Sequence, residues 1–183
     1  MYKLMLVDSD AERATSLEQA LQTAGYQQII RLATSQHLLA AVRTHQPDII
    51  LIDMQSPDRD TLESLNNVNR ETPKPIVFFA QQSDLETTRA AINAGVSAYI
   101  VDDLPSKRLQ SVLEVAIARF QEHQKLKNDH DVIYASKGFC FKDPEAKARF
   151  GNDNCYTTKP KFSEKEQQRL DAIKARQKEL NCK

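Results

Sequence analysis

Short apolar runs alternate with amphipathic stretches over the first 127 residues. The runs are rich in Ile, Leu and Val, and between them apolar residues recur every three or four positions, which indicates strands followed by helices. Strands are expected at 2–8, 28–33, 48–53, 75–80 and 97–101, and helices at 11–25, 35–46, 59–71, 84–95 and 105–127. Continuously apolar strands are typical of a sheet buried on both faces. The pattern therefore predicts an α/β fold with a doubly wound, five-stranded parallel sheet and a long fifth helix.

The chain changes character after residue 127. The three cysteines all lie in the last 44 residues, and half of the twelve aromatic side chains also follow residue 127. We therefore expect two domains, at 1–127 and 128–183.

The second segment carries two helix signals. Asp143 and Pro144 suit the N-cap and the first turn of a short helix, and Ser163 with Glu166 forms a capping-box pattern before a helix that runs to about Leu180. A unit of this size rarely buries enough apolar surface without cross-links. We expect a mostly helical tail that is partly ordered or packed on the first domain.

Charge and apolar patterning bear on the location of the protein and on whether it binds membranes or RNA. Basic and acidic side chains both number 25, and no apolar run approaches the length of a membrane span. The apolar N-terminal run is broken by Asp8, which is typical of a strand and not of a signal peptide. Lysines over 159–178 alternate with acids, which favours a solvated helix over an RNA contact. These features predict a cytoplasmic protein without membrane or RNA binding.

Acidic residues follow three of the expected strands. Asp8, Asp53 and Asp102 lie at strand ends, where parallel sheets collect their functional groups. Carboxylates this close repel each other unless a cation joins them, and Mg²⁺ suits oxygen ligands. The pattern allows a weak Mg²⁺ site, with solvated carboxylates as the alternative, and requires no cofactor. No Gly-rich phosphate loop and no Ser/His/Asp or Cys/His set is present, so we expect no enzyme.

Four segments, "LVDSDAER", "PDIILIDMQSPDRD", "PIVFFAQQSD" and "AGVSAYIVDDLP", resemble the receiver domain of two-component response regulators over roughly 1–120. The resemblance implies a CheY-like sheet of strand order 2-1-3-4-5. It also implies that Asp53 occupies the phosphoacceptor position and Asp8 the acidic pocket. The carbonyl of Gln55 would face the metal, and Tyr99 would be the aromatic that reports activation.

Three switch positions depart from the family pattern. Ser9 replaces the second pocket acid, Ala80 lacks the usual hydroxyl, and Asp102 stands where the family has a lysine. At ~4 Å and an effective dielectric of about 20, exchanging attraction for repulsion changes an interaction by several kcal/mol. Phosphoryl transfer depends on positioning and charge stabilisation. We therefore expect a pseudo-receiver controlled by partner binding, with phosphorylation of Asp53 in the presence of Mg²⁺ as the alternative.

These departures resemble the receivers of nitrate- and amide-responsive transcription antiterminators. That resemblance implies a ligand-sensing protein partner, a homodimer through the fifth helix, or both. The expected contact face consists of Leu113, Ala116, Ile117 and Phe120. The antiterminators' RNA-binding ANTAR module, however, is not recognisable after residue 128.

The segment "IYASKGFCFKDPEAKARFG" instead resembles part of the small YARHG domain. Family members often pair cysteines, so the resemblance implies a possible disulfide among Cys140, Cys155 and Cys182. The junction fits a natural fusion, a frameshift or a constructed chimera. A chimeric inhibitor or antitoxin-like protein, with a toxin-like target, is therefore a further alternative.

Overall fold

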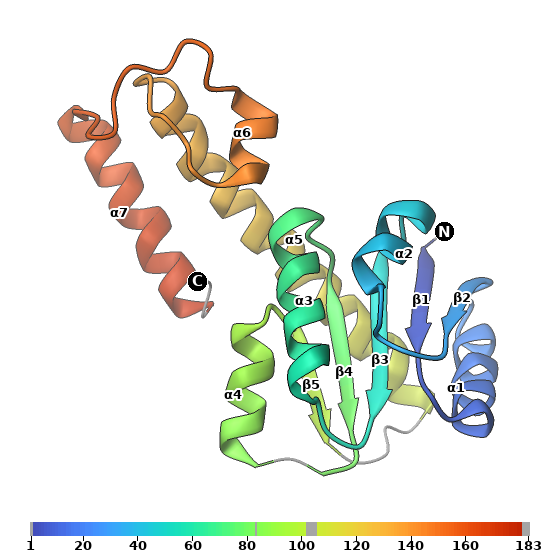
Figure 1. Ribbon diagram of the computed structural model, residues 1–183. Helices are drawn as coiled ribbons and strands as arrows, with labels where there is room; N and C mark the ends of the chain where they lie inside the picture. The colour runs from blue at the N-terminus through green and yellow to red at the C-terminus, as the bar shows by residue number, and fades with distance from the viewer. Residues whose placement is uncertain (1, 83, 102–105, 181–183) are drawn as a thin grey trace. The chain divides into compact units, whose positions relative to one another are not determined.

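A computed structural model describes residues 2–82, 84–101 and 106–180 of the chain. The chain forms two compact units that meet between Phe120 and Gln121. This division precedes the expected boundary at 127/128, because the end of the long helix α5 (Ser106–Ala135) belongs to the second unit (Figure 1). None of the described helices is long and apolar enough to cross a membrane.

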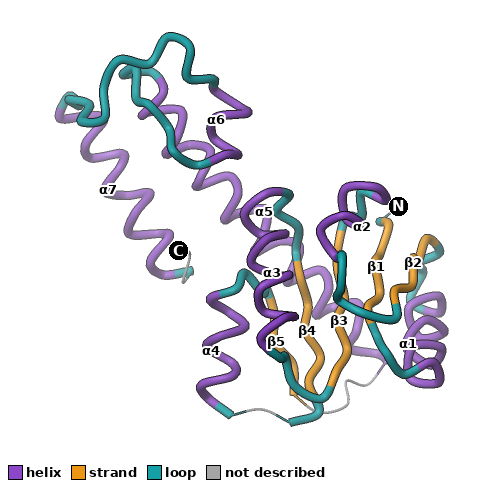
Figure 2. The backbone as a smooth tube through the Cα atoms, in the orientation of Figure 1, coloured by secondary structure: helices purple, strands orange, loops and turns teal. Residues whose placement is uncertain are grey.

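Strands and helices alternate through the N-terminal unit, as the apolar pattern predicts (Figure 2). Its elements before α5 are β1 (Lys3–Val7), α1 (Ala11–Thr23), β2 (Gln28–Leu32), α2 (Leu38–His45), β3 (Ile49–Met54), α3 (Arg59–Glu71), β4 (Ile76–Ala80), α4 (Leu85–Asn93) and β5 (Ala98–Val101). All strand pairs are parallel and the order is β2-β1-β3-β4-β5, which confirms the predicted fold class. The strand arrowheads therefore point to a single edge of the sheet (Figure 1).

Two apolar layers bury the sheet. Side chains of α2, α3 and α4 cover one face, and side chains of α1 and α5 cover the other. Every residue of β4 is buried, as are the first four of β3. Removing these continuous apolar strands from water supplies the main stabilisation of the unit.

The predicted partner face on α5 is wrong for three of its four residues. Leu113 and Ala116 are fully buried, and Ile117 is 5% exposed, all in the layer between α5 and the sheet. Phe120 is half-buried. An apolar stripe on a helix can serve a partner or its own domain, and in a doubly wound fold the helix must first cover the sheet.

The C-terminal unit has a core of its own. The second half of α5 continues past Lys127 to Ala135, and α6 (Pro144–Phe150) and α7 (Glu164–Glu179) follow. Buried Ile133, Leu170 and Ile173 form the apolar centre. The predicted capping box of Ser163 and Glu166 is confirmed. The unit thus has an apolar cluster of its own, whereas partial order was one of the two expectations.

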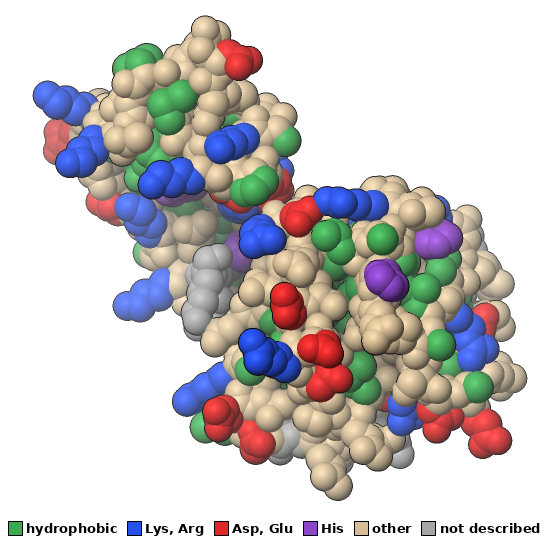
Figure 3. Space-filling view, viewed as in Figure 1, with side chains coloured by type: hydrophobic (Ala, Val, Ile, Leu, Met, Phe, Trp, Pro, Cys, Tyr) green, Lys and Arg blue, Asp and Glu red, His purple; other side chains and the backbone are tan. Residues whose placement is uncertain are grey.

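Ion pairs add to this core. Lys127 Nζ lies 3.0 Å from Asp143 Oδ2 and 2.7 Å from Glu145 Oε2, which joins α5 to α6. Burial by itself would lower the pKa of Lys127, but hydrogen bonds from its ammonium to Glu145 and Asp143 outweigh burial and raise the pKa. Asp143 occupies the predicted N-cap position, yet its side chain makes no cap hydrogen bond. Basic side chains lie among acidic ones on the face of this unit that Figure 3 shows.

Gly25 and Gly95 form a matched pair that tests the packing of the N-terminal unit. Their φ values are +97° and +101°, but an added Cβ meets nothing at Gly25 and lies 2.4 Å from Asn69 Cγ at Gly95. Both Gly→Ala variants should lose about 1 kcal/mol from backbone strain, and Gly95→Ala should lose at least about 1 kcal/mol more. Urea unfolding followed by circular dichroism measures the difference; equal losses would contradict the predicted clash.

Candidate functional site

The carboxyl ends of three neighbouring strands bring the candidate residues together. Asp8 directly follows β1, Asp53 lies near the end of β3, and Ala80 ends β4. Because β1 and β4 both pair with β3, these positions share one edge of the sheet. The predicted juxtaposition of Asp8 and Asp53 is therefore a property of the fold, independent of any ligand.

A guanidinium group joins the two carboxylates. Arg13 Nε donates to Asp8 Oδ2 at 2.9 Å, and the Nη2 of the same side chain donates to Asp8 Oδ1 at 2.6 Å. Arg13 Nε also lies 3.3 Å from Asp53 Oδ1, and its Nη2 donates to the carbonyl oxygen of Asp53 at 3.3 Å. The Asp8 side chain is completely buried, and 26% of the Arg13 side chain is exposed. Arg13 is thus an internal cation between the pocket carboxylates.

The start of α1 positions this cation. Asp10 is the N-cap, and its Oδ1 accepts the amides of Glu12 and Arg13, each at 3.0 Å. The Arg13 amide is the main cause of the lowered pKa of the Asp10 carboxyl. Asp8 Oδ1 also accepts the Asp10 amide at 2.8 Å. The cap therefore fixes the helix start, and the Arg13 side chain reaches back to Asp8. The hydrogen bond to Asp8 is in turn the main cause of the raised pKa of Arg13.

The other predicted pocket positions offer little to a metal or a phosphoryl group. The Gln55 carbonyl accepts the Gln82 amide at 3.3 Å, Ser9 is exposed, and Ala80 is buried without a polar atom on its side chain. Asp102 lies outside the described residues. Within the described part of the chain, no three His, Cys, Asp or Glu side chains are grouped to hold a metal ion. Binding of Mg²⁺ stays a prediction.

Two further acids at this edge have structural roles. Asp58 caps α3 and accepts the Thr61 amide at 2.7 Å, and Asp84 caps α4 and accepts the Thr87 amide at 2.7 Å. Hydrogen bonds from the side chain and then the amide of Thr61 lower the pKa of Asp58, and those from the amide and then the side chain of Thr87 lower the pKa of Asp84. Asp58 and Asp84 therefore stabilise helix starts, which accounts for their presence at this edge without a ligand.

Tyr99 points into the domain. Its ring stacks on the buried Phe78 ring, with centroids 5.3 Å apart and planes 7° apart. Its hydroxyl oxygen is buried and makes no hydrogen bond among the described residues. The predicted reporter aromatic is thus packed against the buried Phe78.

Residues 134–138 of the segment that resembles the YARHG domain lie at the end of α5 and beside an aromatic cluster. The Tyr134 ring contacts the rings of Phe139 and Phe162, with centroids 5.0 and 4.9 Å away. Gly138 has φ +69°, a left-handed backbone conformation that favours glycine, and an added Cβ would displace the exposed Tyr156 ring. The motif therefore ends α5 and anchors the aromatic cluster.

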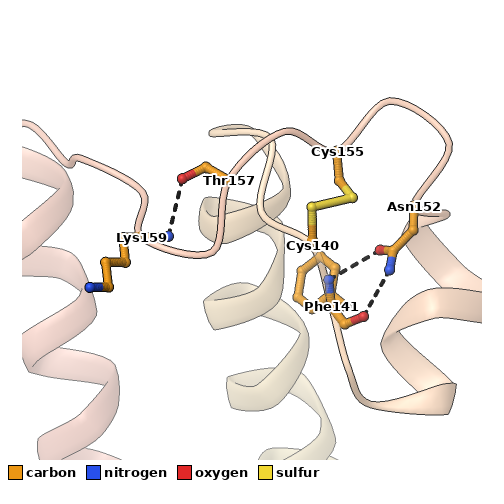
Figure 4. Close-up of a disulfide and its surroundings, with 6 residues drawn as sticks. All are labelled: Cys140, Phe141, Asn152, Cys155, Thr157 and Lys159. Carbon is orange, nitrogen blue, oxygen red and sulfur yellow. Dashed lines mark hydrogen bonds between the residues drawn. A yellow bond between two sulfur atoms is a disulfide. The ribbon is translucent and has the colours of Figure 1, made fainter.

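A disulfide closes the adjacent loop. Cys140 and Cys155 are bonded, with Cα atoms 5.0 Å apart, as Figure 4 shows. The Asn152 side chain accepts the Phe141 amide at 3.1 Å and donates to the Phe141 carbonyl at 2.8 Å. The expected possibility of a disulfide is realised by this pair, whereas Cys182 lies outside the described residues.

The sequence of the first unit matches a known family. Residues 4–114, more than half of the chain, match the response regulator receiver domain. The chain belongs to the response regulator receiver family. Residues 117–178 match the YARHG domain, which extends further toward the N-terminus than the expected partial domain from residue 128.

Known relatives match the receiver region. The transcriptional regulatory protein PdtaR of Mycobacterium tuberculosis is 24% identical over 127 residues, which cover 69% of this chain and 62% of PdtaR. The transcriptional regulatory protein ZraR of Salmonella typhimurium is 33% identical over 121 residues, which cover 65% of this chain and 27% of ZraR. The chain thus spans under two thirds of these relatives.

Solved structures agree on the fold. A CheY-like receiver domain from Methanospirillum hungatei has a TM-score of 0.59 and 23% identity, covering 67% of this chain and 98% of that one. The receiver domain of a modulated diguanylate cyclase from Desulfovibrio desulfuricans has a TM-score of 0.59 and 20% identity, covering 66% and 97%. These similarities establish the receiver architecture.

Arg13 is the functional residue that the sequence reasoning missed. It lies in the first turn of α1, where the partial positive charge of the helix start disfavours a cation. A basic residue there needs nearby carboxylates, and Asp8 precedes the helix in the same segment. An arginine in the first turn of a helix, shortly after an aspartate, was the sequence signal that could have predicted this ion pair.

A double-mutant cycle tests the Arg13–Asp8 pair of the receiver. Arg13→Met should lower the free energy of unfolding by about 2–3 kcal/mol, because it leaves the buried Asp8 carboxylate without its counter-charge. Adding Asp8→Asn should recover at least about 1 kcal/mol.

Arg31→Met is the matched control. Arg31 pairs with Glu18 at 3.4 Å on the surface, where removing the pair should cost at most about 1 kcal/mol. Urea unfolding of the four variants and wild type measures all of these values, and a coupling near zero between positions 8 and 13 would contradict the internal ion pair.

Proposed function

We propose that this chain is a non-enzymatic signalling module: a degenerate receiver that responds to a protein partner and not to phosphorylation of Asp53. The single observation that carries the proposal is the Arg13 guanidinium on Asp8 and Asp53. It occupies carboxylate oxygens that a divalent cation would need for phosphoryl transfer.

The chemistry of arginine favours this interpretation. A guanidinium stays charged throughout the physiological pH range, and its fork matches the two oxygens of a carboxylate. Because Arg13 is part of the chain, it competes with free Mg²⁺ at a high effective concentration. Two substitutions weaken the pocket further: Ser9 lacks the carboxylate that the family uses as a ligand, and Ala80 lacks the hydroxyl that the family has there. The Asp102 substitution acts in the same direction on sequence grounds.

Phosphorylation is the alternative, because Asp53 is retained and arginine can itself bind a phosphoryl group. Incubation with acetyl phosphate and Mg²⁺, followed by intact-mass measurement, separates the two functions. We expect no phosphoryl adduct on the wild type. An adduct that disappears in Asp53→Asn would contradict our proposal.

Mg²⁺ titration isolates the role of Arg13. If the guanidinium excludes the cation, Arg13→Met should bind Mg²⁺ about tenfold more tightly than the wild type, a difference of about 1.4 kcal/mol. Calorimetry on both proteins, with Arg31→Met as the control, measures it. Equal affinities would show that Arg13 does not guard the pocket.

Exposed apolar side chains on the receiver support a protein partner. Those on α4, β5 and α5 are between 43% and 66% exposed: Leu85, Ile92, Val101 and Val115. We propose that this set, called the α4–α5 surface, binds a ligand-sensing protein of the kind that the antiterminator resemblance implies. A homodimer is the other occupant that it suits. A cytoplasmic setting and the antiterminator type belong to this proposal.

Substitution of α4 tests the surface. Leu85→Asp with Ile92→Asp should abolish co-purification with a cognate ligand-sensing protein, and any dimer seen by analytical ultracentrifugation. Both side chains are exposed, so the fold should be retained. Val132→Asp is the control, since Val132 matches Ile92 at 46% exposed but lies in the C-terminal unit. Unchanged association in the α4 variant would overturn the assignment.

A further inference from the structure

The disulfide between Cys140 and Cys155 closes a loop that contains the whole of α6. Between Cys140 and Cys155 lie α6 and the turn that carries Asn152. Figure 4 shows the cross-link beside the paired hydrogen bonds of Asn152 and Phe141. Just outside the loop, Cys140 donates its amide to the Thr157 carbonyl at 2.9 Å. The bond therefore closes the loop at the point where its two ends meet.

Besides the disulfide, this loop is held by the Lys127 ion pairs to Asp143 and Glu145 and by a few ring contacts. Helix α6 has seven residues, and isolated helices shorter than ~12–15 residues are marginal in water. The stacked rings of Phe141 and Phe150, 5.5 Å apart, pack the loop on itself. Five apolar side chains are buried among the described residues of the C-terminal unit: Ile133, Phe141, Ala146, Leu170 and Ile173. Two of the five, Phe141 and Ala146, lie within the loop, so opening it would expose them to water. The cluster of Ile133, Leu170 and Ile173 lies outside the loop.

The two units differ in their redox chemistry. The receiver contains no cysteine, and both bonded cysteines are partly exposed. A dissolved thiol can therefore reach the bond without unfolding the receiver.

We propose that the loop between Cys140 and Cys155 is an oxidation-dependent element of the C-terminal unit, ordered while the bond is closed and opened by a dithiol reductant. One thiolate of the reductant attacks a cysteine sulfur, forms a mixed disulfide and releases the other cysteine as a thiolate. The second thiol displaces the mixed disulfide. The reductant becomes a cyclic disulfide, and its two electrons and two protons end on Cys140 and Cys155. The receiver keeps its fold in both states, and this inference does not depend on the proposed function.

The length of the loop sets the expected effect. Removing a cross-link that closes about 15 residues should favour the open form on the order of 100-fold. Hydrogen exchange measures this opening amide by amide. The informative amides are those of Cys140, Gly151 and Thr157, which donate to backbone carbonyls within the unit. Ile50 in β3 reports on the receiver.

The experiment compares exchange in the full chain before and after treatment with dithiothreitol, in a Cys182→Ser background that removes the third thiol. We expect exchange of the amides of Cys140, Gly151 and Thr157 to rise on the order of 100-fold, while Ile50 changes by less than about twofold. The double variant Cys140→Ser, Cys155→Ser should exchange at the rates of the reduced protein, and dithiothreitol should not change those rates. The reduced protein itself carries the test should that variant fail to fold.

Three outcomes would overturn the inference. Loop amides that exchange equally in the oxidised and reduced forms would show that the core suffices without the bond. A disulfide that survives excess dithiothreitol, by intact mass after alkylation, would show that it is inaccessible. An equal rise at Ile50 would show that the whole chain loosens together.

Discussion

The ion pair between Arg13 and Asp8 determines the charge at the sheet edge that holds Asp8, Asp53 and Ala80. A carboxylate with no exposure to water requires a counter-charge, and here it comes from a side chain five positions later. In receivers that transfer phosphoryl groups, a soluble cation must enter such a pocket. A cation built into α1 offsets one of the two carboxylate charges of Asp8 and Asp53. Under the proposed function, this edge does not respond to metal or phosphate, and the outer surfaces of the domain carry the signal.

Periodicity and strand composition were sufficient to predict the sheet, because continuous Ile, Leu and Val runs have no other stable place in a domain of this size. They also placed Asp8 and Asp53 at one edge, since parallel strands share their direction. They could not place the guanidinium of Arg13, because helical spacing gives a position and not the direction of a long, flexible side chain. The stripe of Leu113, Ala116 and Ile117 was ambiguous for a related reason: the pattern requires an apolar neighbour without saying which one.

The C-terminal unit was harder to predict because its order comes from sparse, long-range contacts. Polar residues beyond Lys127 lack a strong apolar stripe, and α5 continues through them because Ile133 meets Leu170 and Ile173 far along the chain. Three cysteines allow three pairings, and spacing does not choose among them. The chosen pair closes a loop whose entropy is worth about 3 kcal/mol, as much as a small core usually supplies.

These two stabilising devices respond to different chemistry. The Arg13–Asp8 pair is electrostatic and contains no sulfur, so thiol reagents leave it intact. The Cys140–Cys155 bond is covalent, so neither metal ions nor phosphoryl donors act on it. Disulfides are rare in the reducing cytosol, whereas receivers work there. A receiver joined to a disulfide-dependent unit would thus meet its two conditions in different places or at different times. Under the two proposals above, the oxidation state of the second unit would be an input separate from the partner that the first unit binds.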